Sequence, residues 1–71
     1  MAMDAVQAYR ALEAKYPAMR PMQGAGKLRA LAKSLTNDEQ LEQALALVTD
    51  QDMRALIRQR IVPMLNFTPQ L

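Results

Sequence analysis

The sequence contains no cysteine, no histidine and no tryptophan. Without cysteine, the chain can form neither a disulfide scaffold nor a thiolate zinc site, and it has no thiol nucleophile. Without histidine, it lacks the commonest metal ligand and the commonest general base. We therefore expect no metal site and no cofactor.

Long hydrophobic runs are also absent. No apolar stretch approaches the roughly 20 residues of a membrane-spanning helix, and the N-terminus lacks the basic and apolar regions of a signal peptide. These features predict a cytoplasmic protein that does not enter a membrane. Residues 1–3 (MAM) are treated as a candidate leader in front of the natural start.

Small size and few aromatic side chains limit the core. The chain has 71 residues, which allows one domain over residues 1–71, and its aromatic residues are two tyrosines and one phenylalanine. Hydrophobic residues make up 51% of the sequence, but many of them are alanine. A core this thin is marginal by itself, so a dimer or another homo-oligomer is left open.

Apolar residues recur at helical spacing along the chain, and no segment alternates as a strand does. We predict an all-α fold: a compact bundle of four short helices with an irregular C-terminal tail at residues 66–71. The first two helices are expected at 4–16 and 25–35, the third starts at 36, and the fourth starts at 49 and ends or kinks at Pro63. The four predicted core stripes are Ala5, Tyr9, Leu12 and Tyr16 (with Val6 at the edge); Leu28, Leu31, Ala32 and Leu35; Leu41, Ala44, Leu45 and Val48; and Met53, Leu56, Ile57, Ile61 and Met64.

Capping residues mark the predicted helix ends. Asp4 can cap the first helix, and Pro17 stops it. The segment TNDE, from Thr36 to Glu39, matches a capping box in which the hydroxyl accepts a first-turn amide and the glutamate reaches back. The segment TDQD, from Thr49 to Asp52, predicts a similar start for the fourth helix.

The segment at residues 17–24 (PAMRPMQG) is predicted to be a loop, with Met19 and Met22 packed beneath it. It leads into the Gly-Ala-Gly-Lys run at residues 24–27, which resembles part of a phosphate-binding loop. The full pattern G-x-x-x-x-G-K-[ST] would need glycine where Pro21 stands and serine or threonine where Leu28 stands. We therefore interpret both glycines as allowing the chain to turn into the second helix, with no nucleotide bound.

Positive charge is the next candidate signal, although the net charge is only +2. Arg29 and Lys33 lie beside the stripe of the second helix, and Arg54 and Arg58 lie beside that of the fourth. If those helices align, the four cations form one band, with Lys27 nearby, that could hold phosphates. The alternative is a solvated face in which Arg54 pairs with Asp50, four residues before it.

A helix-turn-helix at the second and third helices is disfavoured. The apolar position expected after the turn falls on Asn37, and Asp38 and Glu39 would meet phosphate with the wrong charge.

Arg60 is the most unusual residue, because it falls within the apolar stripe of the fourth helix. A long side chain near a helix end can extend to water or bind main-chain carbonyls, and this is the favoured interpretation. Two alternatives are an ion pair with Glu13 and a role at a protein interface, where arginine is enriched.

Catalysis has little support, because most of the seven carboxylates sit at helix starts and none form a spacing typical of an acid and base pair. We expect a non-enzymatic protein-interaction module of bacterial or phage type: an adaptor, an assembly factor or an inhibitor of a larger protein. The alternative is a small nucleic-acid-binding regulator. The candidate partner or anion contacts are Lys27, Arg29, Lys33, Arg54, Arg58 and Arg60, and the apolar candidates are Met3, Met19, Met22, Leu47, Leu65 and Phe67.

Overall fold

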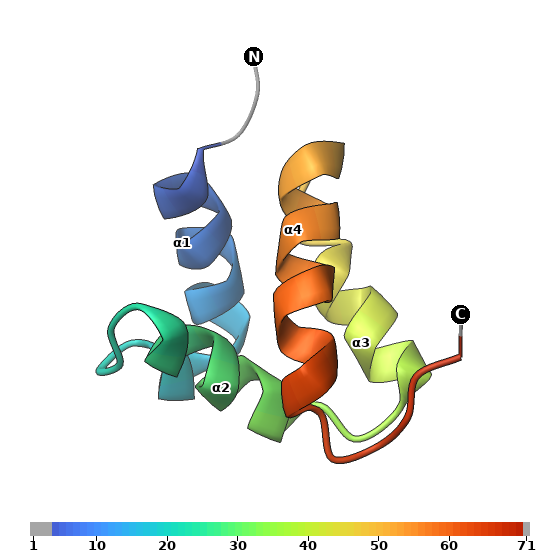
Figure 1. Cartoon of the computed structure of the whole chain (residues 1–71). Helices are drawn as coiled ribbons and strands as arrows, with labels where there is room; N and C mark the ends of the chain where they lie inside the picture. Colours follow the sequence, from blue (N-terminus) through green and yellow to red (C-terminus); the bar gives the residue numbers. More distant parts are fainter. Residues whose placement is uncertain (1–3, 71) are drawn as a thin grey trace.

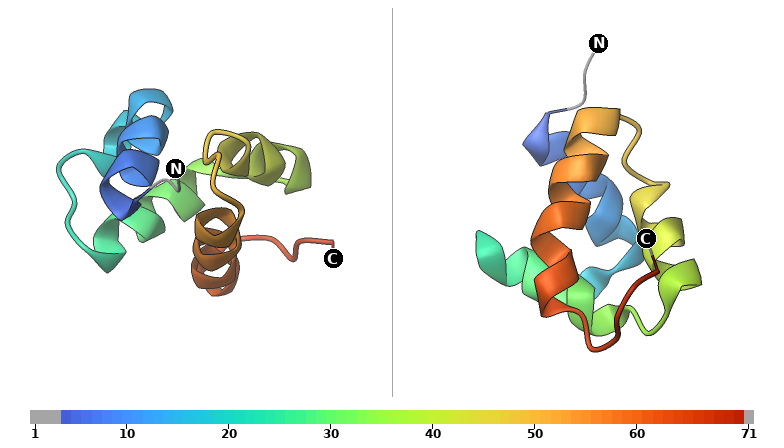
Figure 2. Two further views of the ribbon diagram at one scale, coloured as in Figure 1. Left: turned by 90° about the horizontal axis from the view of Figure 1, so that it is seen from above. Right: turned by 45° about the vertical axis from the view of Figure 1, so that its right-hand side comes forward.

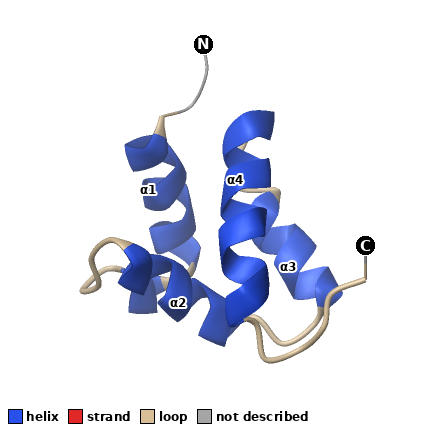
Figure 3. Cartoon of the chain, in the orientation of Figure 1, coloured by secondary structure: helices blue, strands red, loops and turns tan. Residues whose placement is uncertain are grey.

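The computed structural model describes residues 4–70, so the candidate leader and Met3 lie outside the described residues. Within 4–70 the chain forms helices and turns but no strand (Figure 3), which confirms the all-α prediction. The elements are α1 (Ala5–Lys15), η1 (Pro17–Met19), α2 (Ala25–Ser34), α3 (Asp38–Leu45), α4 (Gln51–Ile61) and η2 (Val62–Met64), where η denotes a single 3-10 turn. No helix in this range is long and apolar enough to cross a bilayer.

Helix α2 lies at the centre of the packing. It crosses the lower ends of α1 and α4 (Figure 1) and contacts η1, α4 and η2. Helix α3 also packs against α4, and its C-terminal end lies near the start of α4 (Figure 1). Helices α1 and α4 therefore stand on α2 as outer elements, each covered over only part of its surface.

The core is built from small and medium apolar side chains. Both the α2 stripe and the α3 stripe predicted from the sequence are buried, since each has apolar residues at i, i+3, i+4 and i+7. Burying one leucine contributes about 1.5–3 kcal/mol relative to leaving it in water. The buried residues are Ala8, Leu12, Met19, Leu28, Leu31, Ala32, Leu35, Leu41, Ala44, Leu45, Val48, Ile57 and Ile61.

The outer helices bury narrower faces than their sequences predict. In α1 the buried residues are Ala8 and Leu12, whereas Ala5 is exposed and Val6 keeps 58% of its surface. In α4 the predicted core residue Leu56 is 40% exposed. The stripe predictions are wrong at these edges because neighbouring elements cover only part of α1 and α4, and Ala5 and Leu56 lie outside the covered part.

Both ends of α1 follow the sequence prediction. The Asp4 carboxylate accepts the Gln7 main-chain N–H at 2.8 Å, and the Gln7 side chain accepts the Asp4 N–H at 3.3 Å. This pair forms a complete capping box. The helix ends at Lys15, two residues before Pro17.

The caps of α3 and α4 lie one residue later than predicted. Asn37 and Asp50, not Thr36 and Thr49, occupy the N-cap positions, and each side-chain oxygen accepts the N–H three residues on at 2.9 Å. The Thr36 N–H and hydroxyl both donate to the Gln40 side chain, at 2.8 and 2.9 Å. Two adjacent residues could cap each helix, and asparagine and aspartate are preferred over threonine.

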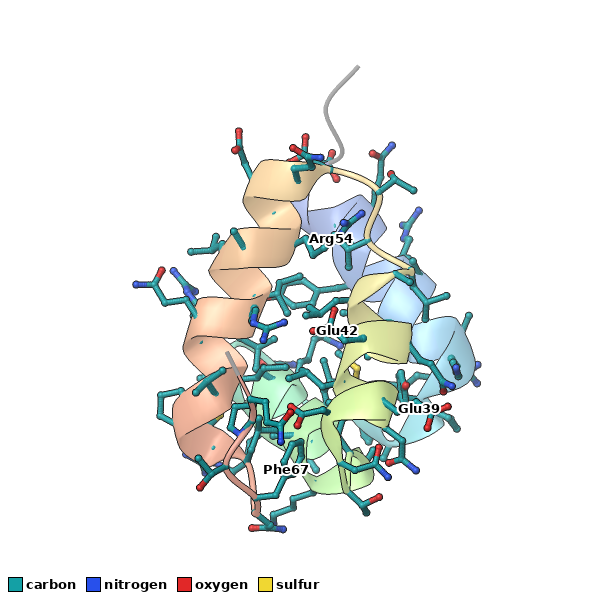
Figure 4. All side chains as sticks on the ribbon, turned by 90° about the vertical axis from the view of Figure 1, so that its right-hand side faces the viewer. Glu39, Glu42, Arg54 and Phe67 are labelled. Atoms are coloured by element: carbon teal, nitrogen blue, oxygen red, sulfur yellow. The ribbon has the colours of Figure 1, made fainter. Side chains whose placement is uncertain are left out.

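The C-terminal tail returns along the bundle to the start of α3 (Figures 1 and 2). Phe67 is half-buried against the core, as predicted, at the foot of the face formed by α3 and α4 (Figure 4). The Gln70 main-chain N–H donates to both Asp38 carboxylate oxygens, at 3.0 and 3.2 Å. Thus the tail is held by one apolar and one polar contact.

Candidate functional site

The site begins with the two glycines at the start of α2. Gly24 has φ 55° and ψ −130°, a conformation that L side chains rarely adopt, and it occupies the N-cap position. Gly26 lies inside α2, and a Cβ placed on it would be 3.5 Å from the Met22 Cβ. The prediction that glycine allows the turn is therefore confirmed for Gly24 and wrong for Gly26.

Lys27 makes two contacts within the fold. Its ammonium forms an ion pair with the Glu13 carboxylate and donates to the Met19 carbonyl at 3.2 Å. The Lys27 and Glu13 side chains are each 21% exposed. Lys27 thus joins α2 to α1 and to η1, and its role as an anion contact stays a prediction.

A groove of about 420 Å³ lies on the outer face of α2, beside the segment that precedes it. The floor of the groove consists of Gly26, Ala30 and Ser34, which recur every four positions on one face of α2. These residues are small, so they leave space on that face. Met22 borders the groove and is 45% exposed. The lining residues are Ala18, Met22, Gly26, Arg29, Ala30, Lys33 and Ser34.

Two cations line this groove. Arg29 and Lys33 are four residues apart on α2, which places them about 6 Å apart along the helix axis. Both residues are exposed. Within residues 4–70 the ion pairs are Lys27 with Glu13 and Arg58 with Glu42, so neither groove cation has a carboxylate partner there.

The other half of the predicted basic band lies elsewhere. The Arg54 Nε donates to the Val48 carbonyl at 3.1 Å, and Arg58 forms an ion pair with Glu42 of α3. In Figure 4, Arg54 and Glu42 lie between α4 and α3. Since α2 crosses α4 and does not align with it (Figure 1), the structure does not bring the four cations into one band. The predicted pairing of Arg54 with Asp50 is also wrong, because no ion pair joins these two residues.

Arg60 is exposed, and among residues 4–70 it forms no side-chain hydrogen bond or ion pair. Its guanidinium therefore reaches water, as the favoured interpretation predicts. The pair with Glu13 is wrong, because that carboxylate binds Lys27. A role for Arg60 at a protein interface stays a prediction.

The apolar candidates divide into exposed and buried groups. Met22 is exposed, which agrees with its place among the apolar candidates but shows that the prediction of Met22 packed beneath the loop is wrong. Met19 is fully buried, which confirms its predicted packing beneath the loop and removes it from the apolar candidates. Leu47, Leu65 and Phe67 are half-buried and pack against the core, so they offer less surface than expected.

Sequence reasoning did not identify the groove floor or the exposure of Val6 and Leu56. The signal for the groove was present as Gly26, Ala30 and Ser34 at four-residue spacing, on the face opposite the leucine stripe.

Comparisons of this chain with protein-family models, curated proteins and solved structures give no match. The groove itself is therefore the basis on which a function is assigned.

Proposed function

We propose that this protein is a small non-enzymatic interaction module of the cytoplasm, and that it docks a larger partner protein in the groove on α2. The observation that carries the proposal is the combination of exposed Met22 with two exposed cations that lack a carboxylate partner among residues 4–70. Apolar surface beside unpaired charge is typical of a docking site, since a partner can cover the one and neutralise the other.

The alternative, nucleic-acid binding, draws less support from the same surface. Two of the four predicted band cations, Arg54 and Arg58, already bind the main chain and Glu42. No aromatic residue lines the groove, so single-stranded bases would have no ring to stack on.

Site-specific photocrosslinking in cells of the native host tests the proposal. A benzophenone amino acid replaces Met22 in one variant and Val6 in a matched control, because both positions carry exposed apolar side chains on different elements. We expect a discrete protein adduct from position 22, unchanged by nuclease, and none from position 6.

Four outcomes would contradict the proposal. Position 22 could give no protein adduct, or positions 22 and 6 could give the same adducts. An adduct at position 22 that nuclease removes would support the nucleic-acid alternative. An adduct of twice the chain's own mass would show a homo-oligomer in place of a larger partner.

A further inference from the structure

We infer that the groove on α2 receives an amphipathic helix of the partner that presents two carboxylates one turn apart. This inference rests on the proposed function and names the chemistry of its partner. It follows from the charge of the groove, from its shape, and from the contacts that Asp38 and Glu42 of α3 already make within this chain.

The charge of α2 is uncompensated only on the groove side. Helix α2 carries Lys27, Arg29 and Lys33 and no acidic residue. Glu13 neutralises Lys27, which leaves Arg29 and Lys33 beside the groove. Carboxylates at positions i and i+4 of a facing helix have the same axial spacing as these two cations, so both can pair at once.

The shape of the groove suits a helix. Small residues at four-residue spacing leave a furrow along α2, and a ridge of side chains from another helix packs into such a furrow. Met22 borders it with a flexible side chain that adapts to apolar residues of different shape. The apolar face of the incoming helix would thus meet Met22, Ala18 and Ala30, while its acidic edge meets the two cations.

A second copy of this chain is a poorer occupant. Helix α3 supplies its most acidic surface, but the Asp38 carboxylate accepts the Gln70 N–H and Glu42 pairs with Arg58. Only Glu39 of that helix is left without such a contact among residues 4–70. Self-association through α3 and the groove would therefore break contacts that stabilise the monomer.

A random 16-residue peptide library displayed on phage, selected against the full chain, tests the inference. We expect the enriched peptides to carry Asp or Glu pairs three or four residues apart, with apolar residues at helical spacing. Replacing a central residue of such a peptide with proline should abolish binding, because proline breaks a helix.

Charge reversal locates the bound peptide. Arg29→Glu with Lys33→Glu should weaken binding of an enriched, fluorescein-labelled peptide at least tenfold, and wild-type binding should weaken as salt rises. The matched control reverses two exposed cations of α1, Arg10→Glu with Lys15→Glu, and should retain the wild-type affinity. Circular dichroism of both variants checks that each is folded before its affinity is compared.

The inference and the proposed function fail in distinguishable ways. Enriched peptides without acidic pairs, or acidic peptides that bind the Arg29 and Lys33 variant normally, would overturn the inference and leave the crosslinking test of the groove standing. A labelled 30-base-pair DNA that binds more tightly than any peptide and is released by the same reversal would overturn it in favour of nucleic acid. A dimer in sedimentation that this reversal dissociates would overturn it in favour of a second copy.

Discussion

Replacing Gly24 with alanine should destabilise the fold through its backbone alone. An alanine Cβ at this position would have no neighbouring atom within 4 Å, so the substitution creates no clash. The cost comes from φ 55° with ψ −130°, which lies outside even the left-handed helical region. Holding a non-glycine residue in so rare a conformation costs about 1–3 kcal/mol, and we place Gly24→Ala in the upper half of that range.

Gly26→Ala is the matched control, because the same atom is added two residues further on. Gly26 lies within α2, and its new Cβ would make an ordinary 3.5 Å contact with Met22. Alanine loses less conformational freedom than glycine when a helix forms, so this change should stabilise by roughly 0.4–1 kcal/mol. The two substitutions therefore shift stability in opposite directions.

Urea unfolding followed by circular dichroism at 222 nm measures the difference. We expect a lower midpoint for Gly24→Ala, a higher one for Gly26→Ala and the same slope for both. A Gly24→Ala protein as stable as the wild type would refute the reasoning, because it would mean that the start of α2 does not require this backbone conformation.

Three further experiments test other contacts. Lys27→Met should cost about 1–2 kcal/mol in urea unfolding, because it leaves the half-buried Glu13 carboxylate without its cation, and adding Glu13→Gln should recover part of that loss. Burial raises the pKa of the Tyr16 hydroxyl above its usual value of 10.0, because the buried site favours the neutral hydroxyl over the phenolate. The stability that Tyr16 contributes is therefore complete below pH 10.0 and is lost as the pH rises through the folded-state pKa. Thermal melts across this range should show a steeper alkaline loss for the wild type than for Tyr16→Phe, and equal losses would contradict the assignment. Arg60→Met should change the unfolding free energy by less than about 0.5 kcal/mol, because the charge is already in water, and a larger loss in calorimetry would show that Arg60 has a structural partner.

The central helices could be predicted from the sequence because their patterns are unambiguous. The residues Leu28, Leu31, Ala32 and Leu35 allow one buried face on α2, and that face is buried. The capping positions were less certain, since Thr36 and Asn37 can both cap and only the folded turn selects one of them.

Which residues of the outer helices α1 and α4 are buried could not be predicted, because burial there depends on how the helices pack and not on the local spacing of apolar residues. Whether Leu56 is buried depends on how much of α4 its neighbours cover, not on its spacing. Similarly, Arg54 and Arg58 match a basic band on a helical wheel, but α3 brings Glu42 to Arg58, and the segment between α3 and α4 brings the Val48 carbonyl to Arg54. Among residues 4–70, Arg29 and Lys33 have no carboxylate or carbonyl partner, and this distinguishes them from Arg54 and Arg58.

The most direct test of the groove is methyl NMR of the protein labelled at methionine. Met22 borders the groove, whereas Met53 is half-buried on α4 and serves as an internal control. On addition of the protein crosslinked at position 22, or of an enriched acidic peptide, we predict that the Met22 methyl signal shifts while that of Met53 does not. A shift of Met53 with Met22 unchanged would place the partner on another face and contradict the account.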